Sequence, residues 1–329
     1  MYSEEDINSA VAAGALSHTS AAAFREHAAK QRNTPTVDNE NFRLISGFND
    51  IFVVIASALL LISVSWMVGS AVQAMAAWLL AEYFTRKRHM ALPSIVLLLA
   101  FVGGVLATTM AWTSFNTFSS GNEIAVAISC AAATAAAWLH WLRFKVPITV
   151  AAGTASLVAV LISMVFYSAP DSQRFASFIL FATGLCVFFL AMRWDSSDTQ
   201  RLSRRSDVAF WLHLVAAPLL VHPVFDLLGV IDGNIGLTQA IIVIILYAVI
   251  ALISLCIDRR ALMVSALGYV LYTLTQLLTS YGTLDESFGI TAFFIGSGLL
   301  LLSVFWHNCR STLLPFFPAT LLQKLPALK

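Results

Sequence analysis

The sequence predicts an all-α polytopic membrane bundle of about ten transmembrane helices, preceded by a small cytoplasmic helical hairpin. Three observations predict this class. Apolar residues make up 59% and charged residues 11% of the 329 residues, whereas soluble domains average about 45–50% and about 25%. The mean hydropathy is +0.81. The charged residues cluster between apolar runs, most of them long enough to cross a hydrocarbon core of about 30 Å.

The composition also excludes several function classes. The net charge is +1, so there is no concentrated basic face for a nucleic acid. The chain holds no phosphate-binding glycine loop, no His-Glu-x-x-His and no paired-cysteine metal motif. We therefore predict the lipid bilayer as the main partner and expect no catalytic residue, no cofactor and no metal site.

Residues 1–46 are predicted to form a cytoplasmic helical hairpin and a linker. Ser3 is a suitable N-cap for a first helix with acids in its first turn, and Gly14 is suited to end it. A second helix is expected from Ser17 to Arg32, with Phe24 facing inward. Because so few residues cannot build a stable core, we expect the hairpin to dock on the membrane part or on a cytoplasmic protein partner.

Residues 47–310 are predicted to form the ten-helix transmembrane domain. The expected spans are 50–67, 69–84, 91–112, 123–142, 146–167, 175–193, 208–229, 238–257, 261–280 and 288–307. The second is the shortest, because its apolar part gives only about 21 Å of helix. It could instead be a re-entrant segment.

The positive-inside rule favours ten spans. With a cytoplasmic N-terminus, the inside segments carry 18 of the 19 Lys and Arg residues, and only Arg174 lies outside. If the second segment did not cross, five would lie inside and fourteen outside. Both termini are therefore predicted to be cytoplasmic. Residues 311–329 alternate Leu and Phe with three prolines, which predicts an interfacial cytoplasmic tail.

The chain resembles a family of uncharacterised bacterial multi-pass membrane proteins with a short N-terminal helical leader, a domain of unknown function. The segments that carry the resemblance are Ser3–Asp6, Ala10–Ser17, Asn41–Asp50, Phe210–His213, Ala217–Pro223 and Asp258–Leu262. The resemblance implies a bacterial inner-membrane location. It implies no catalytic residue.

The predicted seventh span carries most of the candidate site. It contains His213, Pro218, His222 and Asp226, and ionisable residues within a membrane are functional candidates because burying them is costly. Pro218 and the nearby Pro223 cannot donate to the helical carbonyls four residues earlier. Such free carbonyls could bind a cation or polar solute, as broken transporter helices do.

Helical spacing separates the two histidines of this span. Nine residues turn a helix through about 180° net, so His213 and His222 should lie on opposite faces. His222 and Asp226 are four apart and share a face, which predicts an interior-facing proton-relay pair. In the alternative, Asp226 reaches water near the outer surface and His222 hydrogen-bonds a neighbouring helix.

The sequence has four further features of interest. Tyr272 and Gln276 in the ninth span could line a polar cavity or join helices by hydrogen bonds. The segment Asp258-Arg259-Arg260 is interpreted as a tight cytoplasmic turn that anchors the topology. Haem ligation by two of the span histidines stays an alternative. Finally, Ala76–Leu79 recurs as Ala136–Leu139, by duplication or by chance.

Two classes of function follow. The first is a carrier or channel for a small solute or ion, centred on the seventh span. The second is a non-transporting scaffold or sensor that acts through a cytoplasmic partner. A membrane enzyme ranks third, because no nucleophile and base stand out. A cavity that reaches His222 would favour the carrier.

Overall fold

The computed structural model describes residues 4–31, 48–116, 122–199, 201, 203–230, 236–280, 287–318, 322 and 325–326. Across these residues the chain is all-α, with no strand. It divides into two compact units. The first holds the N-terminal hairpin and the second holds the helices from residue 48 onward. The predicted all-α class is confirmed.

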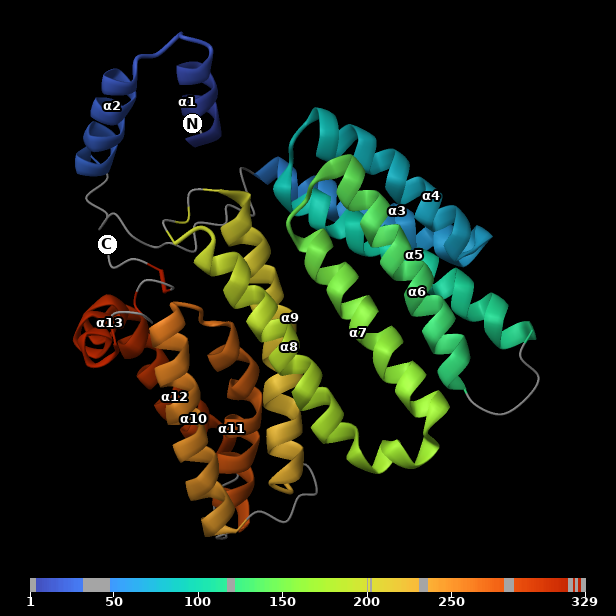
Figure 1. Cartoon of the computed structure of the whole chain (residues 1–329), viewed down its shortest axis with the longest axis vertical. Coiled ribbons are helices and arrows are strands. Elements are labelled where there is room, and N and C mark those ends of the chain that lie inside the picture. Colours follow the sequence, from blue (N-terminus) through green and yellow to red (C-terminus); the bar gives the residue numbers. More distant parts are fainter. Residues whose placement is uncertain are drawn as a thin grey trace. The chain divides into compact units, whose positions relative to one another are not determined.

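The hairpin consists of α1 (Glu4–Ala12) and α2 (His18–Gln31), as Figure 1 shows. Gly14 has a φ of 70°, a left-handed conformation that glycine adopts without strain, and α1 ends just before it. Ile7 and Ala21 are buried where the helices meet. The inward placement of Phe24 was wrong: its side chain is 48% exposed, because Ala21, nearly one turn earlier, takes the face toward α1.

Among the described residues, the second unit contains ten long or medium α-helices followed by a short one, and Figure 1 shows how they are arranged. They are α3 (Phe48–Val68), α4 (Ser70–Ala81), α5 (Ala91–Asn116), α6 (Asn122–Phe144), α7 (Ile148–Ser168), α8 (Ala176–Ser196), α9 (Arg204–Leu227), α10 (Leu237–Ile257), α11 (Ala261–Ser280), α12 (Ser287–Val304) and α13 (Trp306–Leu313). Each of the ten predicted spans corresponds to one helix from α3 to α12.

Eight helices among the described residues are long and apolar enough to cross a membrane, and there are nine if α12 and α13 are counted as one bent span. The bend between these two is 69°. The remaining predicted span is α4, which has 12 residues and continues into a π-helical segment, Glu82–Lys87. The crossing of α4 stays a prediction.

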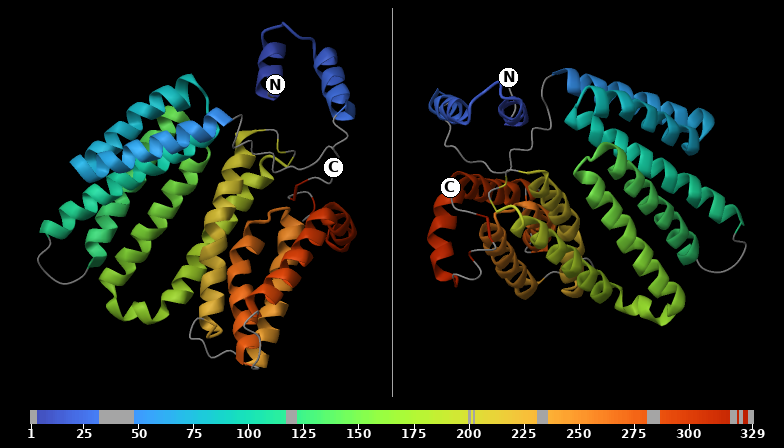
Figure 2. Two further views of the ribbon diagram at one scale, coloured as in Figure 1. Left: turned by 180° about the vertical axis from the view of Figure 1, so that it is seen from behind. Right: turned by 45° about the horizontal axis from the view of Figure 1, so that its top comes forward.

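α9 is the central helix of the second unit. It packs against α7, α8 and α11, and α8 lies beside it along most of its length (Figures 1 and 2). One apolar cluster joins Ala151 of α7 and Val187 of α8 to Leu212 of α9. A second joins Phe225 of α9 to α10 and α11. α9 therefore packs both on helices that precede it in the chain and on helices that follow it.

The tail packs back on this unit. Leu314 and Leu325 are buried against Ala217 of α9 and the turn between α10 and α11. This contact covers the end of α10, the start of α11 and the middle of α9. Placement of the tail at a lipid interface stays a prediction.

The repeated Ala-Ala-Trp-Leu segment does not occupy equivalent environments. Trp78 of α4 packs against the rings of Phe101, His140 and Phe144, with centroids 5.0, 6.0 and 5.0 Å away. Trp138 of α6 is 65% exposed instead. Trp78 thus packs inside the unit, whereas Trp138 lies on its surface. These different environments give no support to a duplicated unit.

Candidate functional site

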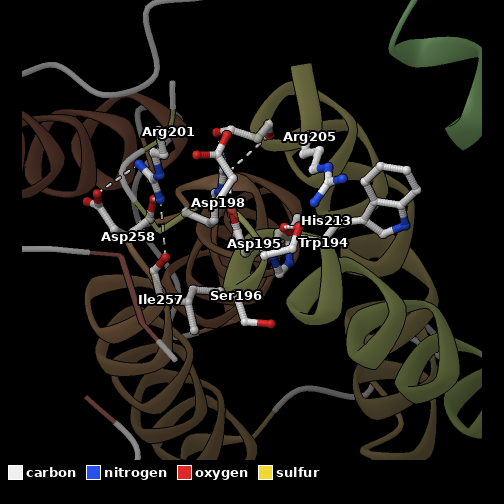
Figure 3. A network of polar contacts seen from close by, with 12 residues as sticks. Trp194, Asp195, Ser196, Asp198, Arg201, Arg205, His213, Ile257 and Asp258 are labelled. Atoms are coloured by element: carbon white, nitrogen blue, oxygen red, sulfur yellow. Dashed lines mark hydrogen bonds and ion pairs between the residues drawn. The ribbon is translucent and has the colours of Figure 1, made fainter. Parts of the chain in front are cut away.

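A network of buried ionic side chains occupies the end of the second unit where the α8–α9 connection, the α10–α11 turn and α13 meet. We call this the Arg-rich end. Figure 3 shows the part of the network around Asp195, Arg201, His213 and Asp258. The ion network, as we use the term, consists of Asp195, Arg201, His213, Asp258, Arg259, Trp306 and Arg310. Four separate parts of the chain supply its members.

Asp195, in the last turn of α8, is the centre of one half of the network. Its Oδ2 lies 3.1 Å from Nε2 of His213 and 3.1 Å from Nε of Arg259. Its Oδ1 accepts from Nη2 of Arg259 at 2.5 Å. These side chains are only 1–2% exposed, so solvent does not screen them.

Arg259 also reaches α9. Its Nη2 donates to the carbonyl and the hydroxyl oxygen of Ser206, at 3.1 and 3.3 Å. An Arg guanidinium bound in this planar, forked manner is held in one orientation. A single side chain thereby ties the α10–α11 turn to both α8 and α9.

Asp258 is the centre of the other half. Its Oδ2 accepts from Nη1 of Arg201 at 2.9 Å (Figure 3), and its Oδ1 accepts from the indole N–H of Trp306 at 2.7 Å. Nη1 of Arg310 forms a longer ion pair with Oδ2, at 3.8 Å. Arg310 also donates from Nη2 to the carbonyl of Pro326 at 2.5 Å, which links the tail to the network.

The backbone at Asp258 explains how the two halves lie next to each other. Asp258 caps α10 in the left-handed region with a φ of 55°, a conformation that Asp tolerates better than most residues. Arg201 has a φ of 54°. Two non-glycine residues in this region, bound to each other, carry local strain of a kind that clusters at functional sites. The sharp turn directs Arg259 inward to Asp195.

Sequence reasoning missed most of this network. The sequence predicted Asp258-Arg259-Arg260 as a turn that anchors the topology, which stays a prediction, but it did not predict that Asp258 and Arg259 are buried and bonded. The available signal was an acid or an Arg at the ends of several apolar runs, such as Asp195 after Trp194. Pairing between runs more than 50 residues apart could not be read from that signal.

Of the predicted site residues, His213 alone enters the network. Its ring is buried and lies edge-on to Phe188, with the centroids 5.4 Å apart. Since an ionised carboxylate only accepts, Nε2–H donates to Asp195. Nδ1 is buried and has no hydrogen-bond partner among the described residues. The ring thus has one nitrogen bonded to a carboxylate and the other buried inside the bundle.

His222 and Asp226 do not form the predicted interior pair. Both side chains are exposed on the unit, so the interior placement was wrong. Nδ1 of His222 lies 2.6 Å from the hydroxyl of Tyr269 on α11, and Asp226 accepts from Ser177 of α8 at 2.5 Å. The two residues bond to helices on different sides of α9, because α8 and α11 each offer a hydroxyl close by. His213 and His222 do lie on different sides of α9, as predicted.

Pro218 and Pro223 lie inside an uninterrupted helix. α9 runs through both, and Pro218 is exposed. The carbonyl of Leu219, which Pro223 leaves without its helical donor, faces Gly184 of α8: a Cβ at Gly184 would lie 2.9 Å from its oxygen. This carbonyl therefore packs against backbone and does not line a cation site.

Tyr272 borders a cavity of about 300 Å³ together with Val230, Gly268 and Tyr269. Tyr269 connects this cavity to His222 through their hydrogen bond. Gln276 is half-buried one turn further along α11. Of the predicted residues, His213 thus belongs to the ion network and Tyr272 to this cavity. His222 meets the cavity through Tyr269, and Pro218 and Asp226 lie apart from both features on the exposed side of α9.

No group of three or more His, Cys, Asp or Glu side chains in the described part of the chain could hold a metal ion. His140, another buried histidine, lies in α6, which packs mainly on α5 and α7, and its Nδ1 is 3.3 Å from the hydroxyl of Thr149. Haem ligation by two of the span histidines stays an alternative.

Comparison with protein-family models, curated proteins and solved structures finds no match. The class of the protein therefore rests on its own fold: it is an all-α membrane protein with multiple apolar helices and a buried ion network at one end.

Proposed function

We propose that this protein is a carrier or channel for a small solute or ion, and that the ion network is its gate at the Arg-rich end. The observation that supports this most is the burial of Asp195 between Arg259 and His213, which come from two other segments of a membrane bundle. We further propose that it resides in a bacterial inner membrane with the Arg-rich end and both termini in the cytoplasm, as the basic residues indicate.

Energetics favour a role beyond stability. Buried ion pairs often contribute no more than well-packed apolar residues of the same size, whereas loss of one partner is costly. Such a network is suited to a two-state element, because its contacts are either all formed or broken together. Movement of α8 and α9 away from the α10–α11 turn and α13 would break it and open this end.

His213 supports H⁺ as the transported or driving ion. Its buried Nδ1 can take up a proton, and the neighbouring carboxylate of Asp195 would stabilise the resulting imidazolium. Protonation of Asp195 would instead remove the charge that holds Arg259. Either step changes the contacts that close the Arg-rich end.

The gate can be tested by cysteine accessibility. Ser254 of α10 is fully buried one turn inside the network, and its carbonyl accepts from the N–H of Arg259 at 3.0 Å. We would place Ser254→Cys in a chain whose four cysteines are replaced by Ala, and label inside-out vesicles with a charged thiol reagent. Because loss of a buried partner costs about 3–5 kcal/mol, Asp195→Asn should raise the labelling rate by more than about tenfold.

Glu82→Gln is the matched control for this experiment. It removes a partly exposed ion pair between the π-helical segment that follows α4 and Arg143 of α6, so labelling should not change. Unchanged labelling in a folded Asp195→Asn protein would refute the gate.

Proton movement is tested in proteoliposomes that contain a pH-sensitive dye and carry a potassium diffusion potential. We expect proton flux above that of empty liposomes, and its loss in His213→Gln. The control is His140→Gln, another buried histidine, which should keep the flux. Equal flux in both variants would exclude His213 from the pathway.

A scaffold or sensor is the second candidate function. The observation that favours it is the N-terminal hairpin, which is a compact unit separate from the bundle. In that case, Asp195→Asn should lower the melting temperature without any change in accessibility, and removal of the hairpin should abolish binding of the cytoplasmic partner.

A further inference from the structure

A second cavity, distinct from the ion network and from the Tyr272 cavity, lies between α11 and the α12–α13 bend. Its volume is about 180 Å³. Its walls are almost entirely apolar: Met263 and Leu267 on α11, and Leu299 and Leu302 on α12. These walls offer a polar ligand few partners, so an apolar chain is the chemistry that fits most of the cavity.

The cavity runs along one face of α11. Met263 and Val264 lie three and four residues after Arg260, and Leu267 lies four and three residues after these two, which places all four on a common stripe about 10 Å long. The residues from α12 and α13 repeat the same spacing opposite. Val264 is 63% exposed, so the cavity opens to the side of the unit, where lipid would lie.

The end of this stripe carries a positive charge. The guanidinium of Arg260 lies over the ring of Trp306, with Cζ 4.9 Å from the centroid, and both residues line the cavity. Arg260 follows the end of α10, at the level where helices reach the headgroup region. Basic pockets between membrane helices are the features that bind anionic lipid headgroups.

Two hydroxyl groups complete the lining. Ser303 of α12 is exposed, and Tyr247 of α10 is half-buried. The hydroxyl of Tyr247 is buried and has no hydrogen-bond partner among the described residues. An ester or carboxyl oxygen near the start of an acyl chain could satisfy such a donor.

From these observations we propose that this cavity binds one acyl chain of an anionic amphiphile, with the anionic headgroup at Arg260 and Trp306. The ligand class is an anionic phospholipid or a free fatty acid, which share this chemistry. The site does not depend on the proposed transport function. It would hold a lipid against Trp306, whose indole N–H bonds to Asp258 of the ion network.

The proposal can be tested by native mass spectrometry of the full-length protein, delipidated in detergent and then titrated with three probes. These are a phosphatidylglycerol, a phosphatidylcholine with the same chains, and oleate. Retention of the phosphatidylglycerol or of oleate, with weak retention of phosphatidylcholine, is expected. Retention of phosphatidylglycerol alone identifies a phospholipid site, whereas retention of oleate as well identifies a site for a single anionic chain.

Three variants locate the site. Arg260→Gln should lower retention of the anionic probe about fivefold, and Val264→Trp, at an exposed position, should block the cavity without a loss of folding. Arg193→Gln removes another basic side chain, exposed at the end of α8, and should leave retention unchanged. Equal retention of all three probes by the parent protein, or parent-like retention in Arg260→Gln, would overturn the proposal.

Discussion

Gly184 of α8 packs directly on the carbonyl group of Leu219 in α9. A Cβ at position 184 would lie 2.9 Å from both the carbonyl carbon and the carbonyl oxygen of Leu219. That oxygen is the one that Pro223 leaves without a helical N–H donor. The glycine therefore lets α8 approach the polar backbone of α9 at the point where the second proline interrupts its hydrogen bonds.

We predict that Gly184→Ala destabilises the bundle by about 1–3 kcal/mol, because the new methyl group meets backbone that cannot give way. The measurement is the midpoint of unfolding in mixed micelles. Gly103→Ala in α5 is the control: a Cβ there meets nothing within 4 Å, so the better helix propensity of Ala should leave stability equal or slightly higher. An unchanged midpoint for Gly184→Ala would contradict the close approach of α8 and α9.

Asp195 and Arg259 should show strong energetic coupling. Asp195→Asn and Arg259→Met should each cost about 3–5 kcal/mol, whereas the double variant should cost clearly less than the sum, with a coupling of about 0.5–3 kcal/mol. The comparison cycle uses Glu82→Gln and Arg143→Met, whose side chains are 29% and 38% exposed. Its coupling should be only about 0.2–1 kcal/mol, and similar coupling in both cycles would argue against a special role for burial.

His222 and Asp226 should behave independently of each other. Each bonds to a different helix, so His222→Ala and Asp226→Asn should each cost about 0.5–1.5 kcal/mol. Their double variant should be additive within about 0.3–0.5 kcal/mol. His213→Ala, by contrast, should lower the free energy of unfolding by more than either of these changes, because it removes a hydrogen-bond donor from the buried Asp195 carboxylate. Clear non-additivity between His222 and Asp226 would restore the relay pair.

The topology predicted from the basic residues can be checked with reporter fusions. Fusions after Arg88 and after Arg205 should report a cytoplasmic location, and fusions within 113–122 a periplasmic one, because 18 of the 19 Lys and Arg residues then lie inside. The decisive fusion is the one after Arg88, since it follows the short α4 and its π-helical extension. A periplasmic signal there would mean that α4 does not cross.

The amino-acid sequence by itself determined the all-α membrane class, the positions of the helices from α3 to α12 and the hairpin stop at Gly14. These features depend on local properties: apolar run length, helical periodicity and glycine conformation all act within a few turns of chain. The same locality explains why His213 and His222 could be placed on different sides of α9 from their spacing alone.

Only the tertiary structure decided which polar side chains meet. Asp195 and Arg259 are 64 residues apart, and His222 and Tyr269 are 47 apart, so helical spacing says nothing about either pair. The sequence predicted a His222–Asp226 pair because the two residues share a face of one helix. In the structure, His222 bonds to Tyr269 of α11 and Asp226 bonds to Ser177 of α8 instead. Burial of Arg259 likewise depends on the left-handed turn at Asp258, a backbone conformation that hydropathy does not reveal.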